Sequence, residues 1–344
     1  MQNLISIEVG ANPDGSPVKK ALATICWVDD DRLLLSFDSL NNQLPRNFHE
    51  CAVVSLATGS QLAGCSLDGW QSQSWSNPKL HAISPSRNLA ASPAGDIVNP
   101  TIVLWDLNSG QQISVLKDIG QRINMCFMDE QTLVVASTDS SRRPPGFVTL
   151  YEMPSGKKLC QYLMPDYINN SPKSVAVSPD KSLVAAGVYQ RVYAWDVNSG
   201  ELVVDVKHPY EVRYLDMVDA RLTSASYACS DAKQIQVKRT LPKAKKSENI
   251  LFKEHTGGVH GLLVSPDGNT AISLANNDGV RIWDFHTGQE IEKRDESFGH
   301  YQGGFSPNGK RIAGMKGKLN SDRKTIGYEL LAFDFELARV SLTV

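Results

Sequence analysis

A short apolar run ending in Trp-Asp recurs along this 344-residue chain, and its spacing constrains the fold more than any other feature. The tryptophans of these pairs lie 90 and 88 residues apart. Each interval is twice about 44 residues, which is the length of a repeated supersecondary unit rather than of a whole domain. We therefore expect a chain of similar units that pack against one another. The pairs are Trp105-Asp106, Trp195-Asp196 and Trp283-Asp284.

Two turn markers recur in the same phase and divide each unit into short strands. Ser/Thr-Gly pairs follow the Trp-Asp position, and glycine there supplies the positive φ of a hairpin turn. Ser-Pro pairs, as at Ser84, Ser178, Ser265 and Ser306, mark a second reversal. β-Branched runs lie between the markers, and no segment carries a capped helical period. Four short strands per unit, repeated radially, predict a β-propeller.

Counting the units predicts an all-β, seven-bladed propeller that forms a single closed domain over residues 1–344. Closure of the ring requires a strand from one end of the chain, because two sheet edges otherwise stay unpaired. Residues 4–9 and 339–344 both have strand character, so the sequence leaves the closing strand open between them. The blades are expected approximately at 21–66, 80–116, 124–163, 174–206, 212–252, 259–293 and 301–344.

The units resemble WD40 repeats over nearly the whole chain. The resemblance is clearest where His255 stands ten residues before Ser265 and where Asp278 precedes Trp283-Asp284. It implies a buried network of His255, Asp278 and Trp283 that stiffens the blade. Leu274 falls where the serine of that network is expected, so we expect the network to be incomplete. The implied structural blade residues are Trp105, Asp106, Trp195, Asp196, His255, Asp278, Trp283 and Asp284.

Composition argues against several functional classes. The formal net charge is −2, from 35 basic and 37 acidic side chains, so no global field favours nucleic acid or an anionic membrane. No stretch approaches the roughly 18 apolar residues that a membrane span requires. The 6 cysteines lack both the spacing of a zinc site and the density of a disulfide scaffold. We therefore expect a cytoplasmic protein without a bound metal, a membrane contact or a nucleic-acid partner.

Enzyme motifs are absent from the sequence. A Gly-rich phosphate loop, a nucleophile elbow and a His-Glu-x-x-His pair are all missing, so no catalytic residue and no cofactor are expected. The alternative is a propeller enzyme or small-ligand binder that uses the central channel, because a propeller gathers distant residues around its axis. The polar side chains expected on the innermost strands are Thr24, Asn124, Ser174, Arg213, His260 and Gln302.

The preferred function is a non-catalytic protein–protein interaction platform, or a sensor or scaffold subunit of a larger assembly. Long connections between second and third strands are expected at 38–50, 92–100, 137–146 and 316–324, and they form a crescent on one face. Loops of this kind carry function, and Trp, Tyr and Arg are enriched in binding hot spots. The predicted partner contacts are Trp70, Trp75, Arg142, Arg143 and Tyr167.

A basic stretch from Lys238 to Lys246 contains five lysines and arginines in nine residues. Such a run is typical of a solvated loop between the third and fourth strands of a blade. It is also a possible contact for an acidic partner. The sequence leaves both interpretations open.

Overall fold

The computed structural model describes residues 5–9, 20–39, 48–68, 81–95, 99–139, 141, 146–165, 172–218, 221–226, 234–242, 246–253, 255–275, 278–294, 304–322 and 325–334. These residues form 28 β-strands. Within these ranges the chain has no helix of the length and apolarity needed to cross a membrane. The prediction of an all-β chain is confirmed.

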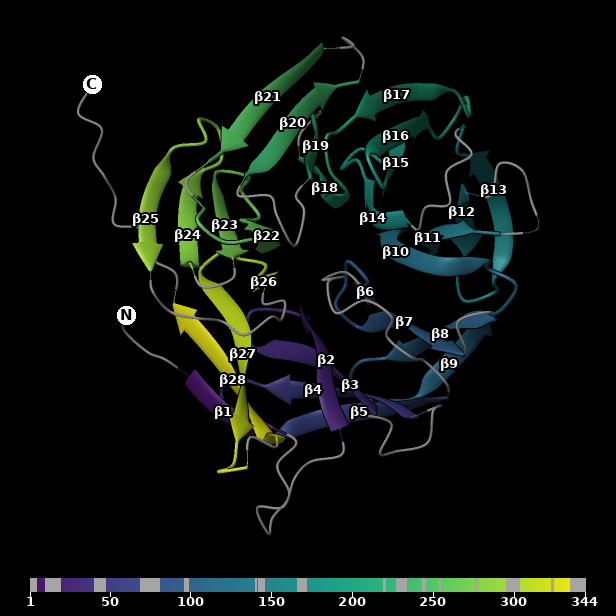
Figure 1. Cartoon of the computed structure of the whole chain (residues 1–344). Helices are drawn as coiled ribbons and strands as arrows, with labels where there is room; N and C mark the ends of the chain where they lie inside the picture. The colour runs from purple at the N-terminus through teal and green to yellow at the C-terminus, as the bar shows by residue number, and fades with distance from the viewer. Residues whose placement is uncertain are drawn as a thin grey trace.

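The strands pair into antiparallel sheets of four, and strands that are consecutive along the chain form each sheet but one. The innermost strands of the sheets surround a common centre, as Figure 1 shows. The first three sheets contain β2 (Lys20–Trp27), β3 (Arg32–Ser39), β4 (Phe48–Ser55) and β5 (Gln61–Asp68); β6 (Ala82–Ile83), β7 (Leu89–Gly95), β8 (Pro100–Asp106) and β9 (Gln112–Leu116); and β10 (Gln121–Asp129), β11 (Thr132–Thr138), β12 (Gly146–Glu152) and β13 (Lys157–Leu163).

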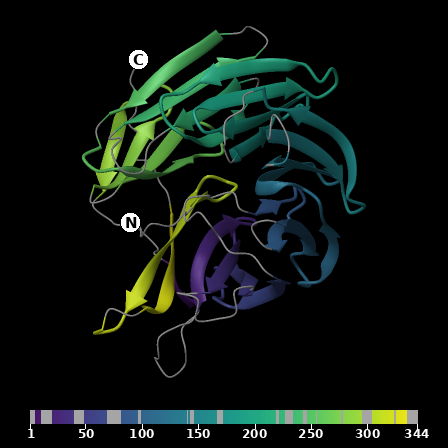
Figure 2. The same ribbon diagram turned by 45° about the vertical axis from the view of Figure 1, so that its right-hand side comes forward.

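Three further sheets follow the same order. They contain β14 (Pro172–Val177), β15 (Leu183–Val188), β16 (Arg191–Asp196) and β17 (Leu202–Lys207); β18 (Val212–Val218), β19 (Arg221–Ser226), β20 (Ile235–Leu241) and β21 (Lys246–Phe252); and β22 (Val259–Val264), β23 (Thr270–Ala275), β24 (Gly279–Asp284) and β25 (Glu290–Arg294). Successive sheets are arranged like the blades of a propeller, which is also visible in the rotated view of Figure 2.

The last sheet joins the two ends of the described chain. Its inner strands are β26 (Gly304–Phe305), β27 (Arg311–Leu319) and β28 (Thr325–Asp334), and its outer strand is β1 (Ile5–Val9). β1 pairs antiparallel with β28, so that Ile5 lies opposite Ala332 and Val9 opposite Tyr328. The N-terminal candidate therefore provides this outer strand. The other candidate, residues 339–344, lies outside the described residues.

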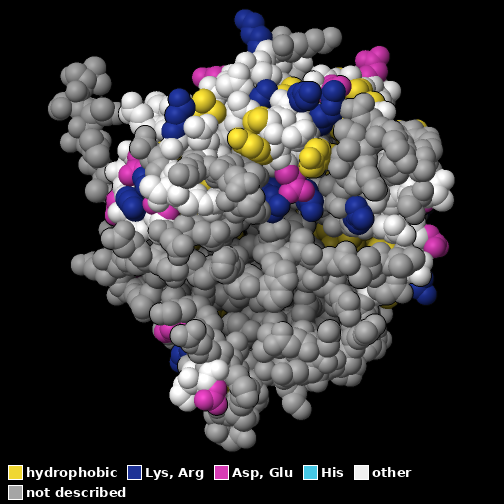
Figure 3. Space-filling model, viewed as in Figure 1, with side chains coloured by type: hydrophobic (Ala, Val, Ile, Leu, Met, Phe, Trp, Pro, Cys, Tyr) yellow, Lys and Arg dark blue, Asp and Glu magenta, His cyan; other side chains and the backbone are white. Residues whose placement is uncertain are grey.

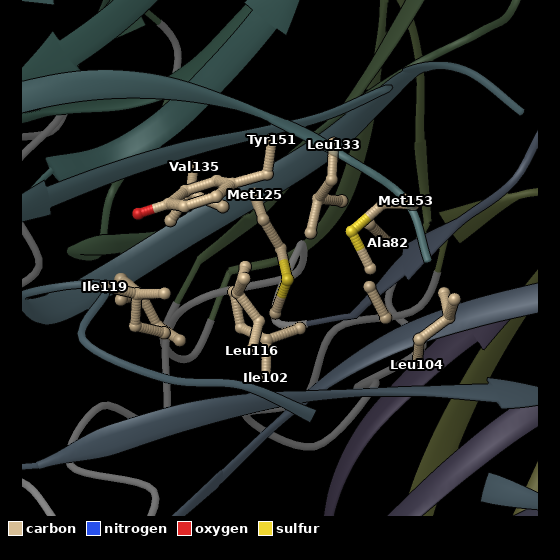
Figure 4. Packing of buried hydrophobic residues seen from close by; sticks show 12 residues of the cluster. Ala82, Ile102, Leu104, Leu116, Ile119, Met125, Leu133, Val135, Tyr151 and Met153 are labelled. Atoms are coloured by element: carbon tan, nitrogen blue, oxygen red, sulfur yellow. The ribbon is translucent and has the colours of Figure 1, made fainter. Parts of the chain in front are cut away.

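Apolar clusters fill the junctions between neighbouring sheets. One cluster packs Ala82, Ile102 and Leu104 of the second sheet against Met125 and Leu133 of the third (Figure 4). Burial of such faces is the main favourable contribution to folding, at roughly 25 cal/mol per Å² of apolar surface. Equivalent clusters join the first and second, third and fourth, fourth and fifth, fifth and sixth, and sixth and seventh sheets.

The junction between the last and first sheets has an apolar cluster of its own. Ala313 and Leu330 pack there with Ile25, Leu33 and other buried residues of the first sheet. Each sheet thus buries both faces against a neighbour, and the arrangement returns on itself. The propeller architecture predicted from the repeat is confirmed.

The two residues of each Trp-Asp pair have different structural roles. The indoles of Trp105, Trp195 and Trp283 are at most 3% exposed and lie between sheets. The following aspartate organises a turn: Oδ1 of Asp106 accepts hydrogen bonds from the backbone N–H groups of Asn108 and Ser109, at 3.0 and 2.7 Å. Asp196 and Asp284 make equivalent bonds in their own turns. The signature therefore combines a core residue with a turn residue.

Two of the expected crescent connections are shorter than predicted because strand residues occupy part of each, which corrects the prediction of four long loops. In the stretch 92–100, residues 92–95 belong to β7 and only the next few residues connect it to β8. In the stretch 316–324, β27 continues to Leu319 and brings Lys316 opposite Glu329 in register. Continued pairing with the long strand β28 extends this hairpin, which is yellow in Figure 2.

Replacing Gly110 with alanine should destabilise the fold more than the same change at Gly200. Both glycines have positive φ, 74° and 73°, so each alanine costs about 1–2 kcal/mol of backbone strain. A Cβ at Gly110 would also overlap the backbone oxygen of Gly64 in the first sheet, whereas at Gly200 the nearest atom is 3.9 Å away. Overpacking adds about 1–3 kcal/mol. Chemical denaturation of both variants measures the difference, and equal losses would contradict the close approach.

Candidate functional site

The sixth sheet contains a complete polar network around His255. Nδ1 of His255 lies 2.9 Å from Oδ2 of Asp278, and Nε2 lies 2.6 Å from Oγ of Ser273. The indole N–H of Trp283 donates to the same Ser273 oxygen at 2.7 Å. The network expected from the resemblance is therefore present, and the expectation that it is incomplete is wrong. Its serine is Ser273, one residue before the predicted position at Leu274.

The donors in this network follow from the chemistry of its members. A carboxylate only accepts, so His255 donates from Nδ1 to Asp278. Burial lowers the pKa of His255 despite the neighbouring carboxylate, which favours the neutral imidazole with Nε2 as an acceptor for the Ser273 hydroxyl. The tryptophan, serine, histidine and aspartate thus form one directed chain of hydrogen bonds. It joins the second and third strands of the sheet to the segment before β22.

Asp278 is the centre of charge in this sheet. Its side chain is 1% exposed, and it accepts from Arg281 at 3.0 Å and from the Thr256 hydroxyl at 2.9 Å. Nζ of Lys293 lies 3.2 Å from Oδ1 of this carboxylate. Burial alone opposes ionisation, but hydrogen bonds from Arg281, Thr256 and His255 outweigh it and hold the pKa of Asp278 well below its usual range. This buried, fully engaged carboxylate is a structural group.

Two further histidine clusters escaped the sequence analysis. In the second sheet, Oγ of Ser92 lies 2.9 Å from Nδ1 of His81 and accepts from Trp105 Nε1 at 2.9 Å. In the fifth sheet, His208 contacts Ser226 and Ser224, at 3.0 and 2.8 Å. The sequence spacing could have revealed the cluster of the fifth sheet, because His208 and Ser226 are 18 residues apart, as are His255 and Ser273. All three histidines are buried between strands of the blades.

The predicted partner contacts Trp70, Trp75, Arg142, Arg143 and Tyr167 lie outside the described residues. The strands that flank them are described, and these strands define where the connections begin and end. Residues 142–145 follow the end of β11 and precede β12, whereas 69–80 and 166–171 lead from one sheet to the next. The assignment of these five residues as contacts stays a prediction.

The basic stretch from Lys238 to Lys246 is not a single solvated loop, which corrects that interpretation. Lys238 and Arg239 belong to β20, and Lys246 already begins β21. Arg239 is 7% exposed and crosses to the sixth sheet, where it donates to the backbone oxygen of Phe285 and stacks 4.8 Å above its ring. A hydrogen bond of 3.1 Å joins it to His286. Arg239 is therefore a clamp between sheets and is not available to an acidic partner.

A cavity of about 530 Å³ lies where the innermost strands meet. Six sheets contribute to its wall, through β2, β6, β10, β18, β22 and β26. Its lining is mainly apolar and includes Trp27, Met125, Phe127, Leu263 and Phe305, with Asp216 as its carboxylate. Among the described residues, no group of three or more His, Cys, Asp or Glu side chains is arranged to hold a metal ion.

Four of the polar residues that the sequence placed in the channel, Thr24, Asn124, Ser174 and Arg213, are not among the described residues that line this cavity. Thr24, Asn124 and Ser174 are at most 4% exposed, and Thr24 bonds to Ser36 at 2.8 Å. Arg213 pairs with Glu211 at 2.5 Å. The side chains of His260 and Gln302 lie outside the described part of the chain. These four polar side chains thus lie away from the cavity, whose lining is apolar apart from a few residues such as His81 and Asp216.

The fold and the repeated networks define a β-propeller with WD40-like blades. No protein-family model matches the chain. A curated relative, WD repeat-containing protein 18 of Danio rerio, is 24% identical over 276 residues, which cover 68% of this chain. These residues span 58% of the relative, so the chain matches little more than half of its length. The resemblance to the WD40-repeat family is therefore confirmed.

Replacing Ser273 with alanine should lower the free energy of unfolding by about 2–4 kcal/mol. The change leaves the Trp283 N–H and His255 Nε2 buried without their partner, and each such group costs about 1–3 kcal/mol. Alanine at the exposed Ser66 of β5 is the matched control and should change stability by less than about 0.5 kcal/mol. Urea titration of both variants tests the network, and similar losses would refute it.

His208 should make the protein lose stability as the pH falls from about 7 towards 4. Burial, with a smaller effect of Lys238, lowers the pKa of His208 to about 4, whereas it is 6.5 in an exposed chain. Between these two pKa values, His208 is protonated in the unfolded chain but neutral in the folded protein. Lowering the pH therefore favours the unfolded state. The full effect is about 3 kcal/mol. In the His208→Gln variant, the free energy of unfolding should depend less steeply on pH in this range. The same slope as in the unaltered protein would exclude His208 as the cause.

Proposed function

We propose that the chain is a closed seven-bladed, non-catalytic protein–protein interaction platform, acting in the cytoplasm as a scaffold or sensor subunit of a larger assembly. Its similarity to a WD repeat-containing protein supports this proposal, because WD40 propellers generally serve as interaction modules rather than enzymes. The proposal assigns recognition to one face of the ring. A rigid disc that displays variable connections binds by shape and by a few strong contacts.

The use of the buried polar groups is the observation that supports this function most. His81, His208 and His255 would be the first candidates for acid–base chemistry in an enzyme. They are instead buried and hydrogen-bonded to serine or aspartate side chains, and His81 also lines the central cavity. Their hydrogen bonds hold strands together and make the ring stiff. A stiff ring loses little conformational entropy when a partner binds, so the entropic cost of association is smaller.

The strand order supports a single recognition face. Because every strand is antiparallel to its neighbours, the connection from second to third strand and the connection to the next sheet leave at the same end of the blades. The predicted contacts Trp70, Trp75, Arg142, Arg143 and Tyr167 all belong to connections of these two kinds. We therefore retain them as the proposed contact set.

The charge distribution favours a protein as the partner. Figure 3 shows lysine, arginine and acidic side chains interspersed over the described part of one face, with apolar side chains between them. Nucleic-acid recognition instead uses a contiguous basic surface. Mixed charges with aromatic and arginine side chains in the loops are typical of protein interfaces.

Alanine at Trp70, Trp75, Arg142 and Arg143 together should abolish recovery of the partner while the protein remains folded. Truncating one residue of a binding hot spot to alanine weakens the binding free energy by about 2 kcal/mol or more. Affinity purification with mass spectrometry measures recovery, and circular dichroism measures folding. The matched control places alanine at Leu62, Leu159, Lys157 and Lys158, which are exposed on outer strands. Equal recovery by a folded quadruple variant would exclude this surface.

The alternative is a propeller that binds a small ligand or carries out a reaction in the central channel. One observation favours it, which is the cavity of about 530 Å³ at the centre of the ring. Pockets of about 300–1,000 Å³ commonly hold small molecules. Failure to recover any reproducible partner with the unaltered protein would favour this alternative.

A further inference from the structure

The central cavity reaches the end of the ring that carries the tight turns between first and second strands. Arg87, Pro266 and Pro307, which line it, belong to three of these turns. The proposed loop contacts belong to connections at the other end of the strands. The cavity is therefore a separate site, and its occupant need not touch those loops.

Aromatic side chains from several sheets contribute to the cavity wall. Trp27, Phe127 and Phe305 come from the first, third and seventh sheets. The indole N–H of Trp27 donates to the backbone oxygen of Gly304 at 2.6 Å, which holds the ring in place. Met125 and Leu263 complete the apolar part. Such a wall can cover a long aliphatic side chain and can present aromatic faces to a cation.

Asp216 places an oriented carboxylate in this apolar wall. The Tyr214 hydroxyl donates to its Oδ2 at 3.1 Å, and the N–H of Met217 donates to its Oδ1 at 2.8 Å. A carboxylate offers about four acceptor positions, so capacity for further donors remains. Among the described residues, no lysine or arginine forms an ion pair with it. The cavity thus holds a positioned negative charge that a cation would neutralise.

The first-to-second-strand turns at this end of the ring carry a small excess of negative charge. The described stretches 28–32, 84–88, 129–131, 178–182, 265–269 and 306–311 contain seven carboxylates and five cationic side chains, and Arg32 and Lys181 pair with Asp29 and Asp129. Hydrogen bonds within the turns lower the pKa of Asp29, Asp129 and Asp267 although partial burial opposes this, so these groups are ionised at neutral pH. Arg87 is the only lysine or arginine among the residues that line the cavity. An approaching basic segment is therefore attracted electrostatically.

We propose that this cavity receives one lysine or arginine side chain from a basic, extended segment of a protein partner. The aliphatic stem packs on Met125 and Leu263, the cation lies among the aromatic rings, and its charge pairs with Asp216. The acidic turns attract the flanking basic residues, and Arg87 is available to main-chain carbonyls of the segment. This inference shares with the proposed function only the premise that a protein is bound, and it uses the opposite end of the ring.

Fluorescence anisotropy with a labelled heptapeptide of sequence serine-glycine-glycine-arginine-glycine-glycine-serine, whose arginine is its one cationic side chain, tests the proposal. A second peptide has citrulline, which is neutral and of similar shape, in place of arginine. We expect the citrulline peptide to bind about tenfold more weakly, and Asp216→Asn to weaken the arginine peptide by a similar factor. The variant should no longer distinguish the two peptides. It retains an oxygen for the Met217 N–H, and thermal unfolding checks that it folds.

Glu201→Gln is the matched control, since it removes one exposed carboxylate from a turn outside the cavity. It should leave both affinities unchanged, also at a salt concentration that screens the acidic turns. Equal losses in Glu201→Gln and Asp216→Asn would overturn the cavity site in favour of a general acidic surface. Binding of free arginine amide as tight as that of the peptide would overturn the protein segment in favour of a small ligand. Absence of binding at about 1 mM peptide would overturn both.

The variant with alanine at Trp70, Trp75, Arg142 and Arg143 separates this proposal from the proposed function. It should bind the arginine peptide as the unaltered protein does, because its changes lie in connections at the other end of the strands. Loss of peptide binding in this folded variant would contradict a separate cavity site. Failure of partner recovery alone would leave the peptide result unaffected.

Discussion

Closure of the ring is the constraint on which the rest of this structure depends. A four-stranded sheet with two apolar faces cannot bury both of them alone, so each sheet needs a neighbour on either side. The junction of the last and first sheets meets this need with Ala313, Leu330 and Ile25, and β1 completes the last sheet beside β28. Residues from opposite ends of the chain thereby seal the ring. The central cavity exists only because this closure brings the inner strands together.

The repeat was predictable because its markers are local turn chemistry. Asp106 and Ser84 bond within a few residues of themselves, so the sequence shows their phase directly. Register is a different matter. Ser273 and Leu274 are adjacent, so their side chains point to opposite faces of β23, and the side chain of Ser273 is the one that bonds to His255 and Trp283. A one-residue slip exchanges the two faces of a strand, and only the assembled sheet determines it.

Site residues were less predictable, since their roles depend on contacts between sheets. Arg239 reads as part of a solvated basic run, but Phe285 and His286 of the next sheet give it both a ring and two acceptors. The cavity has no sequence signal at all. Trp27 and Phe305 are far apart in the chain and look like ordinary core residues, yet the ring places them in one wall. By contrast, the aspartates and tryptophans of the repeat keep local roles, and these could be inferred.

Some buried polar groups stabilise the sheets, whereas others remain accessible to a ligand. Asp278 and His255 are consumed inside a sheet, where four or more hydrogen bonds and ion pairs satisfy them. Asp216 instead lies on β18, an innermost strand, and lines the central cavity, where the Tyr214 hydroxyl and the Met217 N–H are its hydrogen-bond donors among the described residues. A buried charge is retained at low cost only when it is paired. Asp216 therefore avoids full burial by facing the cavity, and the same exposure leaves it ready to meet a cation that enters there.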